Sequence, residues 1–225
     1  ESVEILRSFI SAVQRDSGFP AISEIQISNP MNVRDYSDAK LSIIDVRALD
    51  TAGNRYNVEV QVRSQPAFEE RTLYYWAKSY ADQLSDGTAY GDLHRVVGVS
   101  IVDFNLFSAD LPYHSCFLLT EKDHCEHVLT EDCVLHYLEL PKLPDDPKDE
   151  LAAWLYFLQH AGEEDPVMKV LLDSSKPIRD ASERYRRFTS DDRAREAYLE
   201  RGKIPPGPTG VPRKRPAAGS RRGPR

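Results

Sequence analysis

Apolar residues at the start of the chain predict a helix followed by a strand. In residues 1–15 they recur at helical spacing, at Val3, Leu6, Phe9, Ile10 and Val13. The Gly- and Pro-containing segment 17–20 ends this helix. Residues 21–29 then predict a short strand, and residues 35–40 predict a loop.

Two further segments, 41–49 and 55–63, predict neighbouring strands joined as a hairpin. The second segment alternates strictly, with Tyr56, Val58, Val60 and Val62 on one face and Asn57, Glu59, Gln61 and Arg63 on the other. The connection between the segments, residues 50–54, is short and contains Gly53, which is typical of a hairpin.

The five-residue connection centres the hairpin on Ala52 and so predicts which residues face each other. Asp45 lies opposite Glu59, and directly opposed residues of antiparallel strands share a face with Cβ atoms about 4.5–5.5 Å apart. Gln61 lies on the same face, two residues further along. The predicted register therefore brings two carboxylates and a carboxamide together.

The rest of the chain predicts more strands and then a run of helices. Residues 68–84 predict a helix whose apolar stripe is formed by Leu73, Trp76, Ala77, Tyr80 and Leu84. Three strands are expected at 95–107, 113–121 and 134–141, and helices at 149–160, 163–173 and 180–201.

These segments suggest three regions along the chain. We expect a core over residues 1–143, a helical C-terminal region over 144–203, and a disordered tail rich in Pro, Gly and Arg over 204–225. The Pro-, Asp- and Lys-rich stretch 141–149 predicts the linker between the first two.

Composition restricts the class of protein. With 225 residues the chain is long enough for one domain with a substantial core. No apolar run approaches the roughly 20 residues that span a bilayer, so we expect no membrane segment. Three cysteines are a low and odd number, which indicates a reducing compartment, and we expect the protein in the cytoplasm.

Charge is distributed unevenly along the sequence. The net charge is −7, yet the segment from Lys203 onward carries +7 and no acidic residue, which leaves −14 over residues 1–202. Cationic side chains supply most of the nonspecific affinity for nucleic acid, so the acidic part disfavours loose binding to DNA. A DNA-binding role then requires the acidic and basic side chains to cluster separately.

The opposed carboxylates of Asp45 and Glu59 are the most informative chemical feature. Two carboxylates this close repel unless a positive group lies between them, and Mg²⁺ takes one or two protein carboxylates while keeping water and substrate phosphate as its other ligands. The alternative is that Glu59 pairs with Arg47 or Arg63 on an exposed face of the sheet. The pattern alone leaves both interpretations open.

A second cluster of possible ligands lies later in the chain. It contains His114, Cys116, His124, Cys125, His127, Cys133 and His136. The spacing lacks a Cys-x₂-Cys pair, and Cys133 and His136 are expected on opposite faces of a strand. Buried thiols and loop histidines explain these residues more simply than a zinc site or a thiol nucleophile.

The hairpin and the following helix together resemble a known family. The segments Asp45-Val46, Asn57-Val58-Glu59-Val60-Gln61-Val62 and Phe68-Glu69-Glu70-Arg71-Thr72-Leu73-Tyr74-Tyr75 are similar to the Rpn family of recombination-promoting nucleases, or transposases, within the PD-(D/E)XK nuclease superfamily. Its pattern is an Asp on one strand, Glu-x-Gln on the next, and a helix that begins with Arg and two aromatics. The similarity covers roughly residues 1–203.

The resemblance implies a fold and a set of roles. The fold is an α/β, restriction-endonuclease-like mixed sheet of about five or six strands, flanked by helices and followed by a helical C-terminal region. Asp45 and Glu59 are expected to bind the metal, Mg²⁺ or alternatively Mn²⁺. Gln61 stands where the superfamily most often has Lys, and being neutral it is expected to orient the attacking water by hydrogen bonding.

Three further residues are assigned less directly. Arg71 is expected to contact either a substrate phosphate or a residue that binds the metal. The alternative is a salt bridge to Glu69, Glu70 or another nearby acid. Tyr74 and Tyr75 are expected to be packing groups. The family's N-terminal acidic residue is expected to precede Glu1, and Glu4 is a poor substitute for it.

We therefore expect a Mg²⁺-dependent endonuclease that hydrolyses DNA phosphodiesters in recombination or in mobile elements. The rival interpretation is a catalytically inactive nuclease fold that binds DNA or protein. The oligomeric state and the preferred DNA sequence do not follow from the sequence.

Overall fold

The computed structural model describes residues 2–28, 44–85 and 89–190. Their helices and strands are, in chain order, α1 (Ser2–Asp16), β1 (Ile25–Ser28), β2 (Ile44–Asp50), β3 (Arg55–Gln61), α2 (Phe68–Ala81), β4 (Val96–Val102), β5 (His114–Thr120), β6 (Val128–Glu139), α3 (Glu150–Gln159), α4 (Pro166–Ser174) and α5 (Lys176–Ser190). Two short 3₁₀ turns, Tyr90–Asp92 and Leu140–Lys142, precede β4 and follow β6. The expected loop at 35–40 and the tail at 204–225 lie outside the described residues.

The six strands form one mixed sheet in the order β1-β2-β3-β4-β6-β5. The β3–β4 and β4–β6 pairs are parallel, and the other three pairs are antiparallel. Helix α2 connects β3 to β4, as a parallel pair requires. The expected α/β fold with a mixed sheet of five or six strands is confirmed.

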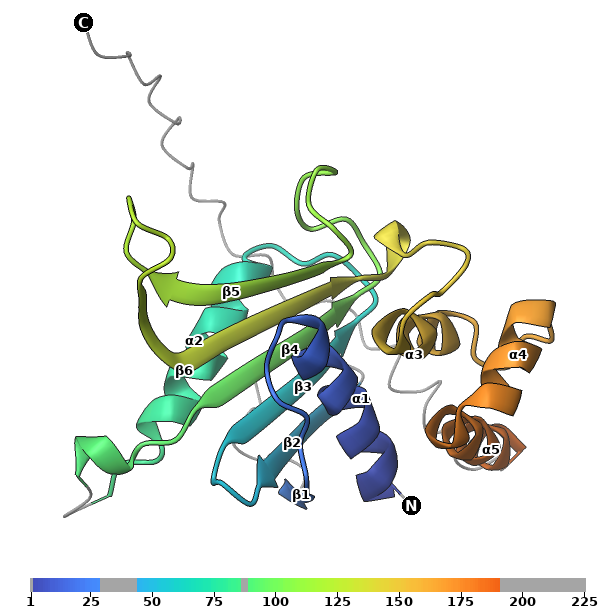
Figure 1. The fold of residues 1–225 in the computed structure, drawn as a ribbon, viewed down its shortest axis with the longest axis horizontal. Coiled ribbons are helices and arrows are strands. Elements are labelled where there is room, and N and C mark those ends of the chain that lie inside the picture. The colour runs from blue at the N-terminus through green and yellow to red at the C-terminus, as the bar shows by residue number, and fades with distance from the viewer. Residues whose placement is uncertain (1, 29–43, 86–88, 191–225) are drawn as a thin grey trace, which may run out of the picture.

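Helices cover both faces of this sheet (Figure 1). On one face α1 packs with the C-terminal helices over a large apolar core that includes Val13, Val97, Val99, Trp154 and Leu155. On the other face α2 covers a smaller core built from Phe68, Val102, Cys133, Leu135 and Tyr137. Consecutive residues of β4 and β6 therefore face different cores, and β4 is buried throughout its length.

The hairpin of β2 and β3 has the predicted register, with Asp45 paired to Glu59. The carboxylate of Asp50 fixes the connection because it accepts hydrogen bonds from the backbone N–H of Ala52 and Asn54 and from the Tyr56 hydroxyl. Gly53 has φ 87°, which favours glycine, and a Cβ there would lie 2.7 Å from the His94 ring. Side-chain chemistry within the connection thus sets the register of the strands.

Several strands differ in length from the prediction, among them β4 and β6. Strand β4 ends at Val102 rather than at 107, because the backbone N–H groups of Leu106 and Phe107 turn back to the buried carboxylate of Glu139. Strand β6 begins at Val128 rather than at 134. Its first residues are exposed and pair irregularly with the end of β5, so they lack the apolar pattern that marks a buried strand.

The predicted apolar stripe of helix α2 is wrong in part. Leu73 is 49% exposed and Ala77 is also exposed, whereas Phe68, Thr72 and Ser79 are the buried residues. The helix turns a mixed face to the sheet because the sheet presents polar residues of β3 as well as apolar ones. It ends at Ala81 rather than at 84.

The C-terminal helices begin at capped positions and share the core of α1. The Asp149 and Asp165 side chains accept hydrogen bonds from the N–H of Ala152 and Met168, the usual N-cap arrangement. Leu151, Leu155 and Ile178 are almost fully buried in the same cluster as α1. None of the helices within the described ranges combines the length and apolarity that a membrane crossing requires.

Strand β6 supplies a direct test of where the core lies. Leu138→Ala removes a side chain with 0% exposure and should lower the free energy of unfolding by about 2–5 kcal/mol. Leu129→Ala, on the same strand but 81% exposed, should change it by no more than about 0.5 kcal/mol. Urea denaturation measures both, and equal losses would contradict the assigned faces.

Candidate active site

Strand β3 carries Glu59 and Gln61 on the face of the sheet that α2 covers. The residues that alternate with them, such as Tyr56 and Val58, point to the α1 core. In the parallel pair with β4, Glu59 lies beside Ser100, which is 2% exposed, and Gln61 lies beside Val102. The Glu59 side chain is 17% exposed and Gln61 is 5% exposed, so both polar groups are largely withdrawn from solvent.

Asp45 occupies the ladder position directly across from Glu59 on β2. Residues paired in this way share a face of the sheet, so the backbone brings the two acidic positions together as the sequence predicted. The side chain of Asp45 lies outside the described ones. The position of Asp45 opposite Glu59 is therefore given by the backbone register alone.

Arg71 of helix α2 reaches across to both β3 side chains. Its Nη2 donates to Glu59 Oε1 at 2.5 Å and to Gln61 Oε1 at 3.0 Å. The salt bridge expected as the alternative for Arg71 is thus present, with Glu59 as the acid. The two oxygens converge on a single cationic nitrogen.

A residue that the sequence did not single out holds the guanidinium of Arg71. Gln65, in the connection between β3 and α2, accepts a hydrogen bond from Nη1 at 2.6 Å. The guanidinium carbon also lies 5.1 Å from the centre of the Phe68 ring, within reach of a cation–π interaction. Sequence could not identify Gln65, since its contact depends on how α2 docks against the sheet.

The guanidinium is not fully satisfied in this arrangement. Its Nε is buried and has no hydrogen-bond partner among the described residues. Gln61 is fixed from its other end, because its Nε2 donates to the backbone oxygen of Arg63 at 3.0 Å, which directs Oε1 toward Arg71. Burial next to this cluster raises the pKa of Tyr137, and the negative charges of Glu69 and Glu59 add to the effect.

Tyr74 and Tyr75 occupy the outer part of α2. Tyr74 is 62% exposed, so its expected role as a packing group is wrong for the described structure. Its ring meets that of Tyr75 edge-on, with 5.5 Å between the ring centres. Tyr74 therefore stands at the surface one turn beyond Arg71, and Tyr75 beside it is partly buried.

The donor set of the site suits a hard divalent cation. Carboxylate and carboxamide oxygens are ligands for Mg²⁺, which needs one or two carboxylates and completes its shell with water and phosphate. Convergence of Glu59 Oε1 and Gln61 Oε1 on one positive nitrogen is the observation that supports this fit. Across the described ranges, no group of three or more His, Cys, Asp or Glu residues is arranged to hold a metal.

Among the described residues, the histidines and cysteines considered for zinc do not come together as a metal site. Cys116 and Cys125 are exposed free thiols, whereas Cys133 is buried on the α2 side of the sheet. His136 follows it on the opposite face, as the strand pattern predicted, and is 0% exposed. Its contacts come from α1 and from β5.

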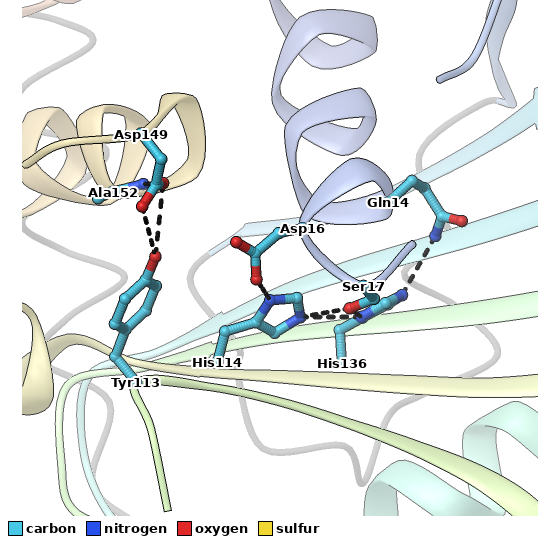
Figure 2. Close-up of polar contacts among 8 residues, drawn as sticks. All are labelled: Gln14, Asp16, Ser17, Tyr113, His114, His136, Asp149 and Ala152. Atoms are coloured by element: carbon cyan, nitrogen blue, oxygen red, sulfur yellow. Dashed lines mark hydrogen bonds and ion pairs between the residues drawn. The ribbon is translucent and has the colours of Figure 1, made fainter. Parts of the chain in front are cut away.

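His136 belongs to a buried chain of hydrogen bonds that joins α1 to the sheet (Figure 2). Its Nδ1 lies 3.0 Å from His114 Nε2, and its Nε2 lies 3.1 Å from the amide nitrogen of Gln14. His114 Nδ1 in turn lies 2.5 Å from the Asp16 carboxylate. Asp16 and His114 are 98 positions apart, so the sequence held no indication of this contact.

One set of tautomers satisfies the whole chain. The Gln14 amide donates to His136 Nε2, so His136 carries its proton on Nδ1 and donates to His114 Nε2. His114 then donates from Nδ1 to Asp16. His136 is neutral in this arrangement, because burial, with a smaller contribution from the neighbouring His114, lowers its pKa to about 3.

Ser17 completes a set that resembles a hydrolase triad, with its Oγ 3.3 Å from His114 Nε2. The backbone N–H groups of Ser17, Gly18 and Phe19 are all bonded to carbonyls of α1. They cannot stabilise an oxyanion, which acyl transfer requires. We assign the cluster to the docking of α1 on the sheet.

The fold and the site on β3 define a class of protein. A mixed sheet with helices on both faces, an acidic position on one strand and Glu-x-Gln on the next are the features of a restriction-endonuclease-like nuclease fold. The family model for PD-(D/E)XK nuclease family transposases matches residues 1–205. The chain belongs to that family. No curated protein and no solved structure matches it.

The ion pair between Arg71 and Glu59 should be visible in stability. Arg71→Met or Glu59→Gln removes this ion pair from a largely buried partner, and each should cost about 1–3 kcal/mol of the free energy of unfolding. The double variant should lose less than the sum of the two, by about 0.5–3 kcal/mol, in a cycle measured by urea denaturation. Additive losses would show that the pair is not coupled in solution.

Neutral His136 predicts a loss of stability in acid. Its pKa is lowered from 6.5 to about 3 in the folded state, so between these values the unfolded chain binds a proton that the folded protein does not. The free energy of unfolding should therefore fall as pH drops below 6.5, with a slope contribution of up to about 1.4 kcal/mol per pH unit.

The free energy of unfolding of His136→Gln, measured by denaturation between pH 7 and 4.5, should fall less steeply with decreasing pH than that of the parent. His127→Gln is the matched control, since the His127 side chain is 75% exposed, and it should keep the parental slope. An unchanged slope in His136→Gln would contradict the assignment of a neutral, buried ring.

Proposed function

We propose that this protein is a divalent-metal-dependent endonuclease that hydrolyses DNA phosphodiester bonds, in recombination or in the movement of mobile elements. Its family consists of nucleases and transposases, so nuclease-like chemistry is the general expectation. The observation that carries the proposal is the convergence of Glu59 Oε1 and Gln61 Oε1 on one cationic atom, opposite the backbone position of Asp45.

In this proposal Asp45 and Glu59 hold the metal, with Mg²⁺ as the expected ion and Mn²⁺ as a substitute. A bound divalent ion would acidify a water molecule and offset the charge that builds on the phosphate. Gln61 is neutral, so it orients the water through its carboxamide and does not remove a proton. The bond from Gln61 to the backbone of Arg63 keeps the carboxamide in one orientation.

Arg71 supplies the positive charge that the phosphate requires. Its planar guanidinium can form two parallel hydrogen bonds to an oxyanion. Helix α2 begins at Phe68, so the site also lies close to the positive end of a helix dipole. These charges are local, which answers the acidity of residues 1–202 without a basic surface over the whole molecule.

A catalytically inactive module that binds DNA or protein is the second candidate. The observation that favours it is the ion pair itself, because Glu59 already has a positive partner 2.5 Å away. In that case the carboxylate and Arg71 are structural, and no cation replaces the guanidinium.

A plasmid-nicking assay with Mg²⁺ or Mn²⁺ separates the two candidates. The parent should nick DNA only in the presence of the ion, and Asp45→Asn and Glu59→Gln should each lower the rate by at least about 100-fold, because each removes a ligand charge. Glu131→Gln is the matched control, since Glu131 also pairs with an arginine at 2.5 Å but lies on β6.

The control should retain the parental nicking rate. Folding of every variant is checked by circular dichroism. Undiminished nicking by both site variants would place the activity elsewhere, and a parent that binds the ion without nicking under any condition would support the inactive module.

A further inference from the structure

Arg71 occupies the place beside Glu59 that a metal ion would take in the proposed reaction. The Nη2 atom that bonds Glu59 at 2.5 Å also bonds Gln61 at 3.0 Å, so it occupies the point where the two oxygens meet. A cation bound to Glu59 would stand within a few ångströms of the guanidinium. Like charges at that separation repel, most strongly where the groups are shielded from water.

The guanidinium has an anchor that does not depend on Glu59. Gln65 holds Nη1 at 2.6 Å, and the Phe68 ring lies beneath the guanidinium carbon. When Nη2 leaves Glu59, Arg71 can therefore stay beside the site. It does not have to swing out into solvent.

A phosphate offers what the guanidinium lacks in this arrangement. Nε is buried and has no acceptor among the described residues, so the pair with Glu59 leaves one donor unused. The side chain is 21% exposed, which leaves part of it accessible to an anionic ligand at the surface. An oxyanion accepts several hydrogen bonds at once and suits the planar fork of arginine.

We propose that the Arg71–Glu59 ion pair couples the binding of the divalent cation to the binding of DNA phosphate. This inference rests on the proposed function. A cation at Glu59 releases Arg71 for the phosphate, and a phosphate at Arg71 releases Glu59 for the cation. Each ligand removes the competitor of the other, so by linkage the two affinities rise by the same factor.

The coupling also keeps the site electrically balanced in both states. Without ligands, the guanidinium compensates the Glu59 carboxylate, which is largely buried. With both ligands, the cation compensates the acid and the phosphate compensates the arginine. A cation alone would leave two positive groups side by side, so the protein should hold it weakly until DNA arrives.

Cation binding without DNA gives the sharpest test, because it needs no turnover. Isothermal titration with Ca²⁺ and with Mn²⁺ measures the affinity of the parent, Glu59→Gln, Arg71→Met and Arg71→Lys. Glu59→Gln should bind at least about tenfold more weakly, since it loses a ligand charge. Arg71→Met should bind about five- to 100-fold more tightly, because the competing charge is gone.

Arg71→Lys separates charge from shape. It keeps a positive group against Glu59, so its cation affinity should stay near that of the parent. Arg7→Met is the matched control for removing an ion-paired arginine, since Arg7 bonds Glu4 at 2.8 Å on α1, on the other face of the sheet. It should leave the cation affinity unchanged.

A second measurement examines the coupling itself. The affinity for a short DNA duplex, followed by fluorescence anisotropy, should rise about tenfold or more in the parent when Ca²⁺ is added, and the Ca²⁺ affinity should rise by the same factor when DNA is present. In Arg71→Met both factors should shrink, because the side chain that links the two ligands is gone. The coupling that remains comes from direct contact between cation and phosphate.

The outcomes distinguish the two proposals. If Glu59→Gln does not weaken cation binding, no ion binds at Glu59 and the proposed function fails with the inference. If Glu59→Gln weakens binding while Arg71→Met fails to tighten it, the site remains and the coupling is overturned. Equal tightening by Arg71→Met and Arg71→Lys would also overturn it, because charge would then not be the cause.

Discussion

The carboxylate of Glu59 imposes the constraint on which the α2 face of this protein depends. It is largely buried between the sheet and helix α2, and a buried carboxylate needs a positive partner to remain ionised. Arg71 supplies that partner from the second turn of α2, so the docking of the helix and the neutralisation of the acid are one event. Gln65 and Phe68 then fix the arginine from the side of the helix.

The two faces of the sheet differ in how completely their buried polar groups are paired. The α1 face buries a large apolar core shared by the N-terminal and C-terminal helices, and its polar groups form a closed chain through Gln14, His136, His114 and Asp16 (Figure 2). Every bond in that chain has a donor and an acceptor. The α2 face instead holds an arginine with one unsatisfied donor beside two oxygens.

The arginine on the α2 face has a consequence for the binding of divalent ions. A site of two or three oxygens with no internal cation would attract any divalent ion that entered it. An arginine held beside the oxygens raises the cost of a cation until a phosphate engages the guanidinium. Such an arrangement would tie cation binding at the proposed site to the presence of substrate, through one side chain.

The sequence by itself determined the strands, their faces and the register of the central hairpin. Alternation along 55–63 and the short connection at Gly53 placed Asp45 opposite Glu59, because both depend on neighbours in the chain. Tertiary structure decided the rest. The contacts of Gln65 with Arg71 and of Asp16 with His114, and the exposure of Leu73, follow from the way α1 and α2 dock on the sheet. Contacts between residues distant along the chain depend on that docking, and no local pattern of apolar and polar positions records it.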